Sequence, residues 1–197
     1  MQVLLSRRGW DQMFASSNAF FAWRRDQPLV RVSPDAYILE AHPQQPLPRI
    51  WQTWRGHAPP LFALEVVSQD RPKEYLVNPE KYAALGATEL VVYDPDDVGH
   101  KVAQKRVRRL HRYGRSLDGA LTLTAQSDAC VYSDVLGAFL VIDTTGPLPY
   151  LRISETPDLS GRIPTHEELA VEERAARLAV EAELDVLRAE LLRLRSE

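Results

Sequence analysis

Short apolar runs broken by proline, glycine and aspartate make up residues 1–164. Several of these runs are rich in β-branched or aromatic residues, which favours strands, and their close, irregular spacing excludes a helical bundle. The pattern therefore predicts an α/β domain in which helices flank a mixed sheet. The predicted strands span residues 19–23, 36–39, 62–67, 90–93, 107–113 and 136–142.

One short helix is predicted between the third and fourth of these strands. Asn78 is a favourable N-cap, Pro79 suits the first helical position, and Gly86 is a typical C-terminal stop. The order strand, short helix, strand is the core unit of the predicted domain. We expect its two strands to be parallel and buried.

A long amphipathic helix is predicted over residues 165–197. Thr165 and Glu168 have the spacing of a capping box, and no glycine or proline follows them. Apolar residues then recur at heptad spacing, which predicts a coiled coil with a second copy of the chain, whereas a solvated monomeric tail is the alternative. The predicted organisation is an α/β domain over residues 1–143, a connector over 144–164 and this helix. The heptad residues are Val180, Leu184, Leu187, Leu191 and Leu194.

The composition is that of a globular protein and excludes disordered, collagen-like and membrane-spanning chains. Of the 197 residues, 45% are hydrophobic and 26% charged, and the formal net charge is −3. No apolar stretch approaches the roughly 20 residues that span a bilayer, and the run at residues 3–5 is too short for a signal peptide. We therefore expect a cytoplasmic protein without a membrane partner. The single cysteine, Cys130, is expected to be a small core residue.

One local basic run stands out against the near-neutral remainder of the domain. It alternates around apolar residues as a hairpin would, so two interpretations stay open: an ordinary exposed face, or a contact with the phosphates of DNA. The run contains Lys101, Lys105, Arg106, Arg108, Arg109, Arg112 and Arg115.

Two acids are the strongest candidates for chemistry. Asp35 precedes one predicted strand, and Glu65 interrupts an apolar run that predicts a central strand. A buried carboxylate is costly unless it is paired, protonated or bound to metal. Two carboxylates on adjacent strands, with a nearby carbonyl and a lysine, would hold Mg²⁺ and an attacking water for phosphodiester hydrolysis. The alternative to a metal site is that Glu65 forms an ion pair with Arg55 or Arg71.

Several segments follow, in order, the layout of a known family. They are SPDAYIL from residue 33, PPLFALEVVS from residue 59, KEY at residues 73–75, EKYAALGATELVVYDPD from residue 80 and VLGAFLVI from residue 135. The chain resembles the Uma-type restriction endonucleases of the PD-(D/E)XK nuclease superfamily, and the resemblance extends from residue 18 onward. It implies a restriction-endonuclease-like fold and a DNA endonuclease that uses Mg²⁺ or Mn²⁺.

The same resemblance implies the metal ligands. It assigns them to Asp35 and Glu65, with the backbone carbonyl of Val66 as a further ligand. DNA is the implied substrate. The alternative function is a decayed nuclease-fold module that binds DNA or protein and self-associates.

The resemblance also implies a lysine that assists the attacking water, and here the chain departs from the pattern. Val67 stands at the superfamily's usual lysine position. Asn78 stands at the family's own position, four residues before the tyrosine that matches Tyr82. Lys81 lies on roughly the same helix face and is the first substitute, and Lys73 is the second.

Overall fold

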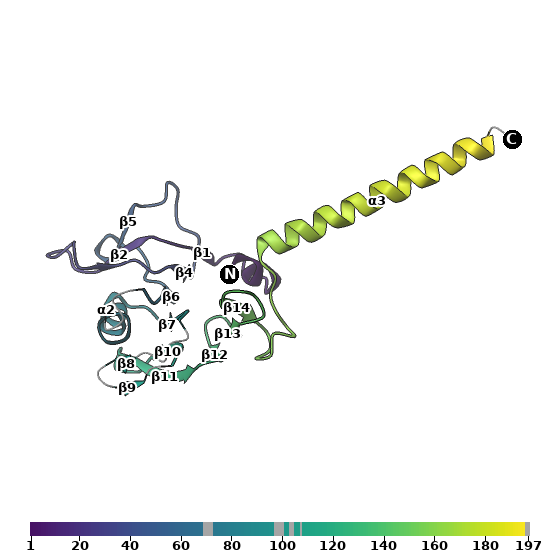
Figure 1. Ribbon diagram of the computed structural model, residues 1–197. Helices are drawn as coiled ribbons and strands as arrows, with labels where there is room; N and C mark the ends of the chain where they lie inside the picture. The colour runs from purple at the N-terminus through teal and green to yellow at the C-terminus, as the bar shows by residue number, and fades with distance from the viewer. Residues whose placement is uncertain (69–72, 97–100, 103–104, 107, 196–197) are drawn as a thin grey trace. The chain divides into compact units, whose positions relative to one another are not determined.

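The computed structural model describes residues 1–68, 73–96, 101–102, 105–106 and 108–195. The chain consists of two compact units, Met1–Ile163 and Pro164–Glu197. Among the described residues, the first contains four sheets and two α-helices. The second contains the long helix α3 (His166–Arg195), drawn in green to yellow in Figure 1. The predicted class, an α/β fold with a mixed sheet and a long C-terminal helix, is confirmed.

Six strands form the main sheet, in the order β1-β4-β6-β7-β10-β11. β6 and β7 run parallel, and every other neighbouring pair is antiparallel. The parallel pair lies in the middle of the sheet, and all five residues of β7 are buried. The strands are β1 (Phe14–Ser16), β4 (Ala36–Leu39), β6 (Phe62–Val66), β7 (Glu89–Tyr93), β10 (Leu110–Arg115) and β11 (Leu121–Ser127).

Three smaller sheets accompany the main one, in the orders β3-β2-β5, β12-β13-β14 and β8-β9. Their strands are β2 (Phe20–Ala22), β3 (Arg31–Val32), β5 (Ile50–Gln52), β8 (Lys101–Val102), β9 (Lys105–Arg106), β12 (Cys130–Ser133), β13 (Ala138–Asp143) and β14 (Tyr150–Ser154). The helical elements of this unit are α1 (Gln2–Arg7), the 3₁₀ turn η1 (Thr53–Arg55), the π-helical turn η2 (Lys73–Val77) and α2 (Asn78–Leu85).

The main core lies where α2 covers the parallel pair. Tyr82 and Leu85 of α2 belong to one buried cluster with Ala63 of β6 and Leu90 of β7. The helix ends at Gly86, whose φ of 102° is a left-handed conformation that favours glycine. The predicted strand, helix, parallel strand unit is therefore the centre of this fold.

The predicted strands agree with the structure in place, with small differences at their ends. The segment 144–164 differs more, because the expected connector contains β14, which pairs with β13. Ile163 is also buried, and the compact unit extends to this residue. Cys130 lies in β12 and is only half-buried, so it is not the core residue that its type suggested.

The start of α2 corrects the predicted role of Asn78. The turn η2 runs directly into α2, so the helical backbone begins before Asn78, and Val77 is the N-cap. Val77 has αR dihedrals instead of the extended backbone that is typical of a capping residue. Its side chain accepts no hydrogen bond from the first N–H groups of the helix. The Asn78 side chain is instead buried and directed at acidic partners, described below.

Three arginines of the basic run hold the fold together. Arg109 donates to two carbonyls that follow β7, and Arg115 donates to three backbone carbonyls. Arg112 places its Nε 2.9 Å from the carboxylate of the buried Glu89. Because these guanidinium groups already bind the protein, neither the exposed-face nor the DNA interpretation fits them. The side chains of residues 101–107 lie outside the described part of the chain.

The C-terminal helix begins as predicted. The Thr165 N–H donates to the Glu168 carboxylate at 2.7 Å, and the Glu168 N–H donates to the Thr165 hydroxyl at 3.2 Å. This reciprocal pair is the capping box. No described residue of α3 is buried. In the described part of the chain, no helix combines the length and apolar character that crossing a membrane requires.

Candidate active site

Asp35 directly precedes β4 and contacts the backbone of β6. β4 and β6 pair with Ala36 opposite Leu64, and the same register continued by one residue sets Asp35 opposite Glu65. The Asp35 N–H donates to the carbonyl of Leu64 at 2.9 Å. In return, the Asp35 carboxylate accepts the Val66 N–H at 2.7 Å. The backbone thus brings the two predicted acids together and fixes the Asp35 side chain against β6.

The backbone of Val66 faces the same way. The N–H of Val67 donates to β7, and successive residues of a strand direct their backbone groups to opposite sides. The N–H and carbonyl of Val66 therefore face the Asp35 side. This is the direction that a metal-binding role of the Val66 carbonyl requires.

Glu65 is buried and held by α2. Its Oε1 accepts the Tyr82 hydroxyl at 2.6 Å and the Asn78 Nδ2 at 3.3 Å. Tyr82 is fully buried, and its hydroxyl has no route to solvent that would compete with this bond. Among the described residues, the partners of Glu65 are therefore Tyr82 and Asn78 rather than an arginine. Arg55 lines a different pocket, and Arg71 lies outside the described residues.

A third acid belongs to this cluster. Glu74 of η2 is buried, accepts a very short hydrogen bond from Asn78 Nδ2, and lies 3.5 Å from the Lys73 ammonium. The Asn78 amide therefore donates to two carboxylates at once. Its Oδ1 is buried and has no hydrogen-bond partner among the described residues. Exchanging the amide oxygen and nitrogen would direct oxygen at two carboxylates, so this orientation is the favourable one.

This environment changes the acidity of Glu65. Burial raises the pKa of its carboxyl to about 7, against the effect of the Tyr82 hydrogen bond. The Glu74 and Asp35 carboxylates add to the rise, and Lys73 opposes it. Both carboxylates therefore lie near enough to Glu65 to disfavour its charged form. A pKa near neutral pH is a feature of carboxyl groups in functional sites.

Of the three acids, Glu65 lines a polar cleft of about 330 Å³. The residues Glu65, Asn78, Lys73 and Lys81 all line it, so both candidate lysines share this cleft with Glu65. They differ in their contacts: Lys73 forms the ion pair with Glu74 and acts on the charge of Glu65. Lys73, the second choice from sequence, is thus the lysine with a defined contact in the acidic cluster.

The donor set suits a hard divalent cation. Carboxylate and carbonyl oxygens are the ligands that Mg²⁺ and Mn²⁺ prefer, and the unpartnered Asn78 Oδ1 is a further oxygen beside them. Among the residues that the structure describes, no group of three or more His, Cys, Asp and Glu is arranged to hold a metal. Asp35 and Glu65 would therefore be a minimal acidic pair, with the remaining positions left to carbonyl, water and substrate oxygens.

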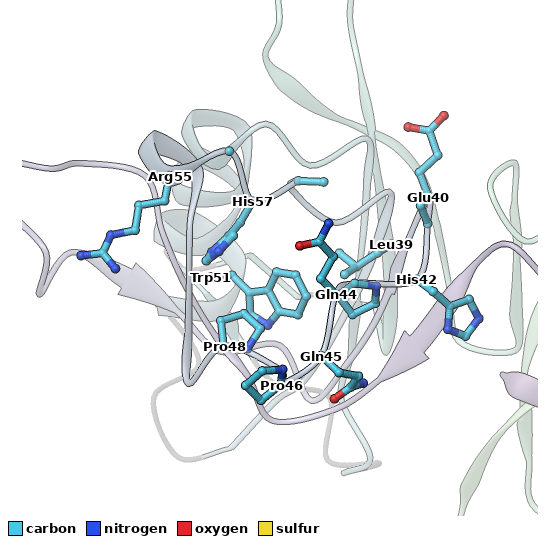
Figure 2. A pocket seen from close by; sticks show the side chains of 14 residues that line it. Leu39, Glu40, His42, Gln44, Gln45, Pro46, Pro48, Trp51, Arg55 and His57 are labelled. Carbon is cyan, nitrogen blue, oxygen red and sulfur yellow. The ribbon is translucent and has the colours of Figure 1, made fainter.

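A larger pocket lies elsewhere on the same unit. It encloses about 660 Å³ and is formed by the segment after β4 and the region of η1. In Figure 2, Trp51 and His57 lie side by side, with Pro46, Pro48 and Gln44 around them, and Glu40 points away. None of the acids of the candidate site lines it. The smaller cleft therefore remains the better candidate for metal-dependent chemistry.

Comparison with protein families identifies the chain. The sequence model of the Uma2 family, described as "Putative restriction endonuclease", matches residues 3–135. The chain belongs to the Uma2 family. Comparison with the curated proteins gives no match. The Uma2 match covers all the acids and lysines of the candidate site and all six strands of the main sheet.

Sequence reasoning missed part of this Uma2 site. Glu74, Asn78 and Tyr82 surround Glu65, but none of them was predicted to contact it. Their spacing of four residues is the signal that could have found them, because such residues share one helix face. A polar, polar, aromatic row facing a buried glutamate indicates hydrogen-bond partners rather than core packing.

Proposed function

We propose that this Uma2 member is a Mg²⁺-dependent DNA endonuclease that hydrolyses phosphodiester bonds with a metal-activated water. The observation that carries this proposal is the meeting of Asp35 and Glu65 across β4 and β6, beside a polar cleft. The proposed metal ligands are these two carboxylates and the carbonyl of Val66. Mn²⁺, which takes the same oxygen ligands, should replace Mg²⁺.

The proposed roles of the protein groups follow from their contacts. When bound, the metal lowers the pKa of its water and neutralises charge that develops on phosphate. Tyr82 and Asn78 hold the Glu65 carboxylate in one position, and the Val66 N–H holds that of Asp35. Lys73 supplies positive charge next to the acids, and Lys81 supplies it further along the cleft.

Cations on the wall of the cleft support a polyanionic substrate. Arg31 lines the cleft together with Lys73 and Lys81, and its guanidinium lies 4.0 Å from the ring centroid of Phe20. Stacking of this kind restrains a guanidinium. Its N–H groups point outward in the plane of the guanidinium itself and stay available. A DNA phosphate that enters the cleft would find these three positive charges beside Glu65.

Cleavage of supercoiled plasmid DNA tests the proposed function. The wild-type chain should nick or linearise the plasmid in Mg²⁺ or Mn²⁺, and EDTA should abolish cleavage because the water is then not activated. Asp35→Asn keeps the shape of the site, removes one charged ligand, and should lower the rate at least about tenfold. Equal cleavage by wild type and Asp35→Asn would place the activity in a contaminant or in another site.

One observation favours the alternative function, a decayed nuclease module. Asn78 occupies the family's lysine position, and its neutral amide leaves the pKa of Glu65 near 7 instead of lowering it. Such a site binds metal less readily at neutral pH. A chain that retards DNA in a gel but never cleaves it, with either metal, would support the module.

We further propose that the heptad stripe of α3 mediates self-association. Its five residues expose between 46% and 57% of their surface in the isolated chain. Contiguous apolar surface of this kind is uncommon on monomers and marks an interaction site.

A further inference from the structure

From Glu183 onward, the charges beside the heptad stripe differ in sign between its two sides. The stripe places Leu184 and Leu191 at heptad positions a, and Val180, Leu187 and Leu194 at positions d. The two positions g that precede the a residues are Glu183 and Glu190. The positions e that follow the three d residues are Glu181, Arg188 and Arg195. In a parallel coil, Glu181 faces the neutral position g at Ala176. Acid thus borders the stripe on side g, and the last two of the three residues on side e are basic.

This arrangement distinguishes two ways of pairing helices. In a parallel two-stranded coil, a g residue faces the e residue that lies five positions later on the partner helix. Glu183 then faces Arg188 and Glu190 faces Arg195, and symmetry doubles each pair. An antiparallel coil sets g against g, and the Glu183 and Glu190 side chains then face glutamates. Only the parallel arrangement matches every described charge at these four positions.

The contacts within one helix leave these side chains available. Arg188 lies 3.4 Å from Asp185, with both side chains more than 70% exposed. Exposed ion pairs of this kind contribute little to stability. Arg188 can therefore exchange Asp185 for a glutamate on the partner helix. Glu183, Glu190 and Arg195 are likewise exposed.

We propose that α3 binds α3 of a second copy of the chain as a parallel, in-register, two-stranded coil over residues 180–195. This inference rests on the proposed self-association and is independent of the nuclease activity. Parallel pairing attaches both α/β units at the same end of the coil. Antiparallel pairing over the same residues would attach them at opposite ends, farther apart than the roughly 45 Å length of one 30-residue helix.

Cysteine cross-linking of the full chain tests the orientation. In a background where Cys130 is changed to Ser, Leu194→Cys brings two thiols together at a d position of a parallel coil, within the range of a disulfide. In an antiparallel coil the two would lie roughly 15 Å or more apart. Leu192→Cys is the matched control, because Leu192 is exposed on the same turn but lies outside the stripe. We expect Leu194→Cys to form disulfide dimers at least about tenfold faster than Leu192→Cys.

Sedimentation of the unmodified chain completes the test. A dimer that the double substitution Arg188→Glu and Arg195→Glu weakens at least about tenfold supports the parallel coil, because all its g and e charges are then acidic. A dimer of unchanged affinity in that variant, or equal cross-linking of both cysteine variants, overturns the orientation. A monomer at high micromolar concentration overturns the pairing altogether, whatever the cleavage assay shows.

Discussion

Glu65→Gln should make the protein more stable at pH 8 and at the same time remove its metal-dependent cleavage. The pKa of Glu65 is about 7 in the folded chain and about 4.5 when unfolded, so the folded state binds more protons between these values. Its stabilising effect is complete below pH 4.5 and is lost as the pH rises through 7. Glutamine has the same shape and carries no charge, so it avoids this loss.

The expected size of the stability effect is about 3 kcal/mol at pH 8, from the 1.36 kcal/mol that accompanies each pKa unit. Thermal melts from pH 4 to pH 8 measure it: wild type should lose stability above pH 4.5, and Glu65→Gln should lose less. Glu80→Gln is the control, since Glu80 is exposed on α2 and outside the cleft. Parallel pH profiles for wild type and Glu65→Gln would show that Glu65 titrates normally.

The cleavage rate of Glu65→Gln should fall at least about a hundredfold. Substituting a residue that hydrogen-bonds to a metal ligand typically lowers metal affinity or activity ten- to a hundredfold. Substituting a charged ligand itself should lower the activity more. Plasmid cleavage in Mg²⁺ at pH 8 provides the measurement. A stabilised variant that still cleaves DNA at the wild-type rate would separate Glu65 from the chemistry.

Asn78→Lys should raise the cleavage rate about tenfold or more at pH 7. The ammonium would lie between Glu65 and Glu74, where Asn78 Nδ2 now donates to both carboxylates. Positive charge there lowers the pKa of Glu65 and places a proton donor next to the proposed metal site. The adjoining cleft of about 330 Å³ has room for the longer side chain.

The pH dependence of the rate identifies the cause of this gain. Asn78→Lys should shift the acidic limb of the pH–rate profile below that of wild type. Asn78→Met is the matched control, because methionine fills similar space without charge, and it should not raise the rate. If Asn78→Lys and Asn78→Met behave alike, lysine placement does not limit this site.

Local patterns were sufficient to predict the centre of the fold. The apolar run at residues 62–67 and the stop at Gly86 correctly predicted β6, α2 and the parallel β7, because burial and a left-handed backbone leave clear local signals. The role of Asn78 was not predictable in this way. Its capping signal is local, whereas the π-helical turn η2 and the pairing with Glu65 and Glu74 depend on tertiary structure.

For Arg109, Arg112 and Arg115, the basic run was a misleading local signal for the same reason. The partners of Arg109 and Arg115 are backbone carbonyls, which no sequence pattern marks. The partners of Arg112 are Glu89, 23 residues earlier in the chain, and Asp134, 22 residues later.

For the candidate site, the sequence identified Asp35 and Glu65 from their places in the predicted strands. The third acid and the hydrogen bonds to Glu65 were not predictable, because they depend on how η2 and α2 pack over β6.

Calorimetric titration of the full chain with Mg²⁺ at pH 7, in two buffers of different ionisation enthalpy, tests the central claim most directly. The account predicts one site per chain that binds the metal with release of about half a proton, because a Glu65 pKa near 7 leaves the carboxyl about half protonated. Asp35→Asn and Glu65→Gln should each weaken binding at least about tenfold, and Glu65→Gln should release no proton. Absence of binding, or equal affinity and proton release in the wild type and both variants, would contradict it.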